Sequence, residues 1–124
     1  MTRTEFLQVL RHETARHRVQ WTIEPGRDDY GSIRADVPDR DGTPCTVCPI
    51  TFVDWIRDDN DFERPMKTHD YPDAADALTL DADLACEIAR SADGDFDADD
   101  FGEGGTPATR DALEQACFGK RGAA

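Results

Sequence analysis

Two histidines and a glutamate in the segment HETARH, residues 12–17, come close to the pattern of a helical zinc site. The metalloprotease motif needs two histidines four residues apart on one helix, with a glutamate directly after the first. His12 and His17 are five residues apart, which turns the second imidazole about 140° away from the first. One helix cannot present both side chains to one metal ion, so we expect a solvated helix end here.

Cys45 and Cys48 form a CxxC pair that could supply half of a zinc site. His69 or Cys86 would have to complete it, because the chain has no second CxxC and no HxxxH pair at a suitable spacing. We therefore expect the four cysteines, including Cys117, to be reduced, metal-free thiols that are largely buried as small apolar side chains.

The stretch SADGDFDADDFGEGG, residues 91–105, contains six carboxylates and no basic residue. An EF-hand calcium loop needs a glycine at its sixth position and a bidentate glutamate at its twelfth. Counting from Asp93, these positions hold Ala98 and Gly104, and a frame that starts at Asp95 fails at the same two places. A calcium-binding role is therefore a minor alternative, and no metal ligand is assigned.

Nucleophilic catalysis and phosphate binding find equally little support. Ser32 and Ser91 are the only serines, and neither lies in a G-x-S-x-G turn. The glycines of the GEGG stretch stand among carboxylates, which would repel a phosphate. We expect a protein that is not an enzyme, with no catalytic residue and no cofactor.

Local signals predict an α+β fold in which a first helix precedes a small antiparallel sheet of about three strands. The first helix covers residues 2–17, with a capping box at its start. Alternating segments at 19–24 and 32–37, separated by a glycine-containing turn, predict a hairpin. The segment 47–53 alternates in side-chain type with both faces partly apolar, which predicts a third strand whose end turns into a short helix at residues 53–57.

Two or three helices are predicted after the sheet, in residues 73–80, 81–93 and 106–119. The last is the most strongly signalled, with Thr106 as N-cap, Pro107 at its first position and Gly119 as its stop. The whole chain, residues 1–124, is predicted to be one domain. Its core is expected to contain Trp21, Ile23, Ile33, Ile50, Phe52, Leu84, Ile88 and Leu113.

The net charge of −13 is concentrated in the middle of the chain. Residues 1–53 carry eight acids and seven bases, residues 54–105 carry seventeen acids and four bases, and residues 106–124 carry two acids and three bases. A halophilic protein spreads its carboxylates over the whole surface, and the nearly neutral first part does not fit that habit. We call residues 54–105 the acidic block and residues 93–105, predicted to be a loop, the acidic segment.

No apolar run of 18 or more residues occurs, and the N-terminal stretch lacks the apolar core and cleavage site of a secretory signal. These absences predict a soluble, cytoplasmic protein.

A surface this acidic repels nucleic acid and attracts the basic grooves that bind nucleic acid. If residues 93–99 are extended, the aspartates at every second position lie roughly 6 to 7 Å apart, which is close to the spacing of phosphates along one DNA strand.

Phe96 and Phe101 interrupt the acidic segment with apolar side chains, which a purely solvating tail does not need. They could anchor a partner, or they could instead be tucked into the protein's own core beneath a mobile acidic loop. Both interpretations remain open at the level of sequence.

The chain resembles the small acidic inhibitors of bacteriophages and mobile elements, the anti-CRISPR and anti-restriction proteins. The resemblance rests on size, α+β organisation, the acidic block and the absence of a catalytic motif, not on a diagnostic motif. The stretches CPITFVDW, DLACEIARSADG and RDALEQACFG are also similar to short phage and proteobacterial proteins of unknown function. The resemblance transfers no catalytic residue.

It implies an inhibitor, anti-CRISPR-like, that blocks a basic nucleic-acid-binding protein or ribonucleoprotein complex through a DNA-mimicking acidic face, without binding nucleic acid or membrane itself. The partner-binding residues expected are Asp58, Asp59, Asp61, Asp93, Asp95, Phe96, Asp97, Asp99, Asp100, Phe101 and Glu103. The alternative from another class is a small structural or accessory domain whose acidity serves solubility alone.

Overall fold

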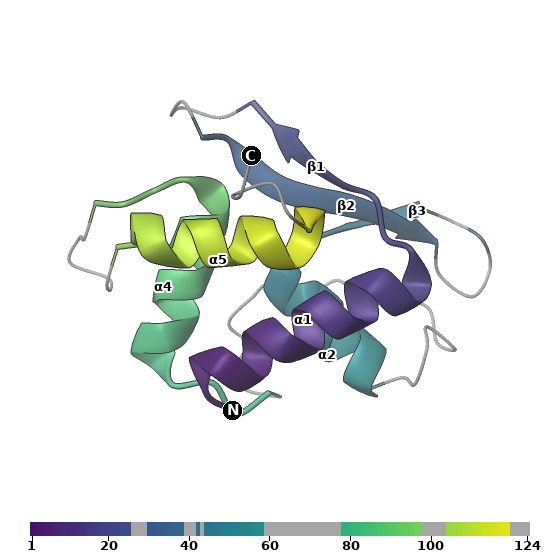
Figure 1. The fold of residues 1–124 in the computed structure, drawn as a ribbon, viewed down its shortest axis with the longest axis horizontal. Coiled ribbons are helices and arrows are strands. Elements are labelled where there is room, and N and C mark those ends of the chain that lie inside the picture. The colour runs from purple at the N-terminus through teal and green to yellow at the C-terminus, as the bar shows by residue number, and fades with distance from the viewer. Residues whose placement is uncertain (26–29, 39–41, 43, 59–77, 98–103, 120–124) are drawn as a thin grey trace.

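The computed structural model describes residues 1–25, 30–38, 42, 44–58, 78–97 and 104–119. Along the chain, helix α1 is followed by three strands and then by helices α2, α4 and α5. The strands form one antiparallel sheet in the order β1-β2-β3, and the helices lie on one side of it (Figure 1). The predicted α+β fold, with a helix before the sheet and further helices after it, is confirmed.

Helix α1 (Arg3–His17) begins and ends with the signals that the sequence carries. The Thr2 hydroxyl accepts a hydrogen bond from the Glu5 backbone N–H, and the Glu5 side chain accepts one from the Thr2 N–H, so the predicted capping box is present. Arg18 adopts a left-handed conformation with φ 54°, which ends the helix. Phe6, Leu10 and Thr14 form its buried stripe.

The predicted hairpin is also confirmed. Strand β1 (Trp21–Glu24) pairs with strand β2 (Ser32–Pro38), and β2 pairs with strand β3 (Pro44–Val47), both antiparallel. Gly31 precedes β2 with φ +70°, and a Cβ there would lie 2.5 Å from the Glu24 carbonyl oxygen. Only glycine fits this close approach between the two ends of the hairpin.

The third strand lies earlier than the sequence predicted. Residues 47–53 were expected to be extended, but β3 ends at Val47 and helix α2 (Pro49–Asp58) follows, so the short helix expected at 53–57 begins four residues earlier than predicted. Pro49 occupies the first helical position, and the Thr51 hydroxyl accepts from the Cys48 N–H, which closes the first turn. Residues 49–56 are all buried, so every side of the helix faces the protein interior and the spacing of apolar residues does not reveal the helical period.

Helices α4 (Ala82–Asp93) and α5 (Pro107–Phe118) confirm two of the later predictions. The Thr106 hydroxyl accepts from the Thr109 N–H, and Gly119 follows the last helical residue, as expected. The remaining prediction, a helical pattern in residues 73–80, falls mostly outside the described residues. Only 78–80 are seen, as a turn in which Leu78 and Leu80 are buried.

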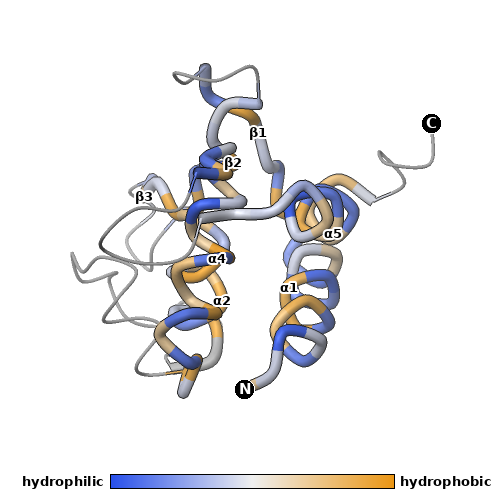
Figure 2. Tube along the Cα trace, turned by 90° about the vertical axis from the view of Figure 1, so that its left-hand side faces the viewer, coloured by the Kyte–Doolittle hydropathy of each residue, from blue (hydrophilic) through white to orange (hydrophobic). Residues whose placement is uncertain are grey.

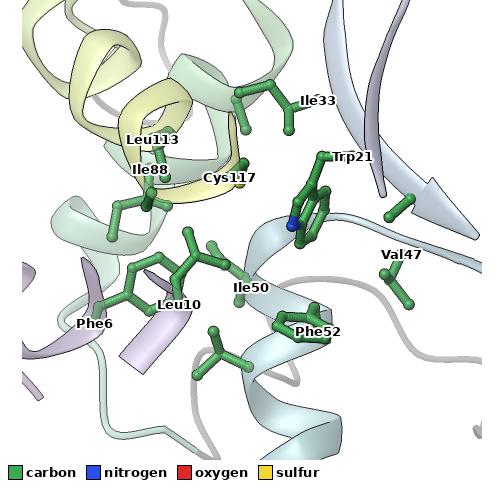
Figure 3. Close-up of a cluster of buried hydrophobic side chains, with 14 of the residues drawn as sticks. Phe6, Leu10, Trp21, Ile33, Val47, Ile50, Phe52, Ile88, Leu113 and Cys117 are labelled. Atoms are coloured by element: carbon green, nitrogen blue, oxygen red, sulfur yellow. The ribbon is translucent and has the colours of Figure 1, made fainter. Parts of the chain in front are cut away.

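The core lies between the sheet and the helices (Figure 3). Figure 2 shows α1 beside α5 on one side of this core and α2 beside α4 on the other, all beneath the sheet. Trp21 packs edge-on against Phe52, with ring centroids 5.4 Å apart, and its indole N–H donates to the Thr14 hydroxyl at 3.1 Å. Of the eight predicted core residues, six are buried, whereas Ile23 and Leu84 are half-buried.

Candidate partner-binding surface

Among the residues that the structure describes, the most deeply buried charged side chain belongs to Arg110 on α5, which is 1% exposed. Its Nη1 donates to the carbonyl oxygens of Gly31 at 2.8 Å, Ala92 at 2.9 Å and Ser91 at 3.2 Å, and its Nη2 donates to the Tyr30 carbonyl at 2.9 Å. These carbonyls belong to the two residues that precede β2 and to the last turn of α4. One guanidinium therefore joins three elements that are far apart in the sequence.

The charge of Arg110 is balanced locally. The Glu114 carboxylate lies one helical turn later, with Oε2 3.8 Å from Nε, and the guanidinium carbon lies 5.7 Å from the centroid of the Tyr30 ring. The carbonyls of Ser91 and Ala92 are at the negative end of the α4 macrodipole, which further favours a cation.

Sequence reasoning missed Arg110, although a signal was present. Arg110 stands three residues before Leu113 and seven before Cys117, so it falls on the buried face of the predicted helix. An arginine on such a face, with a glutamate four residues later, indicates a buried ion pair rather than a solvated charge.

The first residues of the acidic segment are folded back on α4. Gly94 is left-handed with φ +77°, the Asp95 N–H donates to the Arg90 carbonyl at 2.8 Å, and Gly105 N–H donates to the Asp95 carbonyl at 2.8 Å. The Asp97 N–H donates to the Asp95 carboxylate, and Arg90 donates to the Asp97 carbonyl. The extended repeat assumed for residues 93–99 is therefore wrong at its start, because Asp93 is helical and the chain then turns.

Two of the carboxylates in this turn have basic partners. Asp93 accepts from Arg34 at 2.8 Å, and Asp95 lies 4.0 Å from Arg90, with the two carboxylate side chains 44% and 48% exposed. Asp97 is exposed and makes no ion pair within the described part of the chain. The uncompensated charge of this surface therefore begins at Asp97.

Phe96 contacts the protein's own surface. Its ring meets the Tyr30 ring at 4.8 Å between centroids in an edge-to-face arrangement, and the side chain is half-buried. Tyr30 is 45% exposed, so the two rings form a small aromatic patch beside the aspartates.

Of the predicted partner-binding residues, the structure brings Asp93, Asp95, Phe96 and Asp97 together at the end of α4. Asp58 is the last residue of α2, and its side chain lies outside the described residues, as do Asp59, Asp61, Asp99, Asp100, Phe101 and Glu103. Asp54, at the start of the acidic block, is 6% exposed on α2 and cannot contribute to an exposed acidic face.

The other sites considered in the sequence take ordinary positions. On α1, His17 lies 3.3 Å from the Glu13 carboxylate, and the side chain of His12 is 74% exposed. Within the described ranges, no group of three or more histidine, cysteine or acidic side chains is arranged to hold a metal ion.

The cysteines differ in burial. Cys45 and Cys48 are half-buried at the end of β3 and the start of α2, whereas Cys86 and Cys117 are buried, and none of the four forms a disulfide. Burial raises the pKa of the Cys117 thiol well above its usual range, the Arg110 charge partly opposes this, and the Glu114 charge adds to it.

Comparisons with protein-family models, curated proteins and solved structures gave no match to this chain. Among the residues described, no helix has both the length and the apolar character needed to span a bilayer.

Proposed function

We propose that the protein is a non-enzymatic inhibitor, of the anti-CRISPR type, that blocks a basic nucleic-acid-binding complex through an acidic face. The observation that carries this proposal is the distribution of charge: the whole surplus of −13 lies in the acidic block, while the flanking parts are nearly neutral. A binding surface requires such local concentration, whereas solubility alone does not.

The fold supports the proposal by holding the start of the acidic segment in one conformation. Arg110 joins the end of α4 to the hairpin, and Arg90 donates to the Asp97 carbonyl, so the chain leaves α4 in a defined direction. A segment ordered before binding loses less conformational entropy when it meets its partner. The residues from Asp97 onward are then the ones whose charge a basic groove would neutralise.

Phe96 has a different role in this proposal from the one expected. It packs on Tyr30 and leaves part of the Tyr30 ring exposed. The apolar anchor offered to a partner is therefore Tyr30 with the edge of Phe96, placed beside the aspartates. Aromatic rings next to carboxylates suit arginine, which stacks on one and pairs with the other.

One set of contacts favours the second candidate, a small accessory domain whose acidity serves solubility. Asp93 and Asp95 are paired with Arg34 and Arg90, and Phe96 is covered in part by the protein itself. An acidic surface that satisfies its own charges needs no partner. The two candidates differ in whether the remaining carboxylates bind anything.

The experiment is a binding assay of the intact protein against a panel of purified basic complexes, including RNA-guided nucleases and restriction enzymes. The test variant carries Asn in place of Asp95, Asp97, Asp99 and Asp100. We expect binding by the parent that fades between about 50 and 500 mM salt and is lost in the variant.

The control changes three aspartates of the nearly neutral first part, Asp36, Asp39 and Asp41, to Asn. It removes three charges from outside the acidic block and should bind almost as tightly as the parent. If parent, variant and control bind equally, or if none binds any complex of the panel, the acidic face has no inhibitory role and the solubility candidate stands.

A further inference from the structure

A shallow groove of about 240 Å³ runs between α1 and α5, on the side of the molecule where these two helices lie next to each other (Figures 1 and 2). It is formed by one face of each helix and does not include the acidic segment. The residues that line it are Thr4, Leu7, Gln8, Arg11, Ala112, Gln115 and Ala116.

The lining combines an apolar floor with a polar rim. Leu7 is half-buried and Ala116 is 7% exposed, so they lie toward the floor, whereas Gln8, Arg11 and Gln115 are exposed. A hydroxyl, two amides and a guanidinium can all donate hydrogen bonds into the groove. Although the chain has 27 acidic residues, none is among the described residues that line this groove.

Arg11 is unusual among the arginines of its own helix. Arg3 pairs with Glu87 and Arg16 pairs with Glu13, but Arg11 has no ion-pair partner within the described part of the chain. A guanidinium has a planar set of donors that matches a carboxylate in a bidentate geometry. At the edge of an apolar floor, this group suits a molecule that carries one carboxylate and a short hydrocarbon chain.

We propose that the groove between α1 and α5 binds a small organic carboxylate, with the carboxylate on Arg11 and the hydrocarbon part on Leu7 and Ala116. This inference is independent of the proposed inhibitor function, because it concerns other helices and other residues. The net charge of the chain does not prevent binding at physiological salt, since exposed charges beyond about 8 Å are largely screened.

In the test, hexanoate is titrated into the intact protein at about 150 mM salt, the physiological ionic strength. Backbone amide chemical shifts of Thr4, Leu7, Ala112 and their neighbours are followed during titration. Small ligands in open sites bind weakly, so a saturable shift with a Kd on the order of 1 mM is expected. Hexylamine, which has the same chain and the opposite charge, should not shift these amides.

Three variants test which charged side chains determine the affinity for hexanoate. Arg11→Gln should raise the Kd about three- to fivefold, the loss expected for one ion pair on an exposed side chain. Arg18→Gln removes another exposed arginine that does not line the groove and should leave the Kd unchanged. Asp111→Asn removes an exposed carboxylate one turn before Gln115 and should lower the Kd.

The proposal is overturned by any of three results: no saturable shift below about 50 mM hexanoate, equal binding of hexylamine, or the same Kd in Arg11→Gln and the parent. All three replaced side chains are exposed, so the variants should keep the helical circular dichroism of the parent. An unchanged spectrum makes a loss of binding attributable to the groove.

Discussion

Replacing Arg110 with methionine should destabilise the protein more than the loss of any other single ion pair described in the structure. Methionine has a similar length but no donor, so the carbonyls of Tyr30, Gly31 and Ala92 lose the hydrogen bonds that they accept from the guanidinium. The Ser91 carbonyl keeps the Gly94 N–H at 3.2 Å as a second donor.

The magnitude follows from these three carbonyls and from Glu114. Each buried acceptor left without a donor costs about 1–3 kcal/mol, less where water can reach it, and Glu114 loses its cation. We expect a loss of about 3–5 kcal/mol in the free energy of unfolding, the range found when one partner of a buried charged network is removed. Urea denaturation followed by circular dichroism measures it.

Arg34→Met is the matched control. Like Arg110, Arg34 contacts the end of α4, in this case through Asp93. The Asp93 side chain is 44% exposed, so the ion pair should contribute at most about 1 kcal/mol. If Arg110→Met costs no more than Arg34→Met, the buried guanidinium does not join the hairpin to α4 as described. If Arg110→Met fails to fold, Arg110→Lys should fold with reduced stability, because it keeps the charge and loses part of the hydrogen bonding.

The core and the buried thiol give two further predictions. Ile50→Ala or Leu113→Ala should each cost about 2–5 kcal/mol, since both side chains are at most 1% exposed, and a melting temperature shift no larger than that of the exposed control Gln20→Ala would contradict the core assignment. Because burial raises the folded-state pKa of Cys117, its contribution to stability is fully present below the ordinary thiol value of 9.0 and is lost as the pH rises above it, by about 1.4 kcal/mol at pH 10. Cys117→Ala should remove that alkaline loss in urea denaturation at pH 8 and pH 10, and equal losses in the two proteins would show that the thiol is not shielded.

Elements with strong local signals were predictable from the sequence. Helix α1 has a capping box, α5 has Thr106, Pro107 and Gly119 at its ends, and the hairpin has a glycine where the chain must turn closely. These signals act within a few residues, so tertiary contacts do not override them. Residues 49–56 were harder to predict, because all of them are buried and their apolar side chains fitted a strand as well as a helix.

The candidate site was only partly predictable for another reason. The concentration of carboxylates in the acidic segment is evident in the sequence, but their pairing with Arg34 and Arg90 depends on how α4 meets the sheet. The contact between Arg110 and Gly31 joins residues 79 positions apart. No local pattern specifies such a contact. The contact nevertheless holds the end of α4 and so determines the direction in which the acidic segment leaves this helix.

Competition with DNA tests the proposed function most directly. A basic complex that the protein binds is first loaded with labelled duplex DNA, and the protein is then added while the fluorescence anisotropy of the DNA is measured. We predict that the parent displaces the DNA at near-equimolar amounts and that the variant with Asn at positions 95, 97, 99 and 100 does not, because the acidic face and the DNA occupy the same groove. A stable complex that holds protein and DNA together, or equal displacement by the variant, would contradict this account.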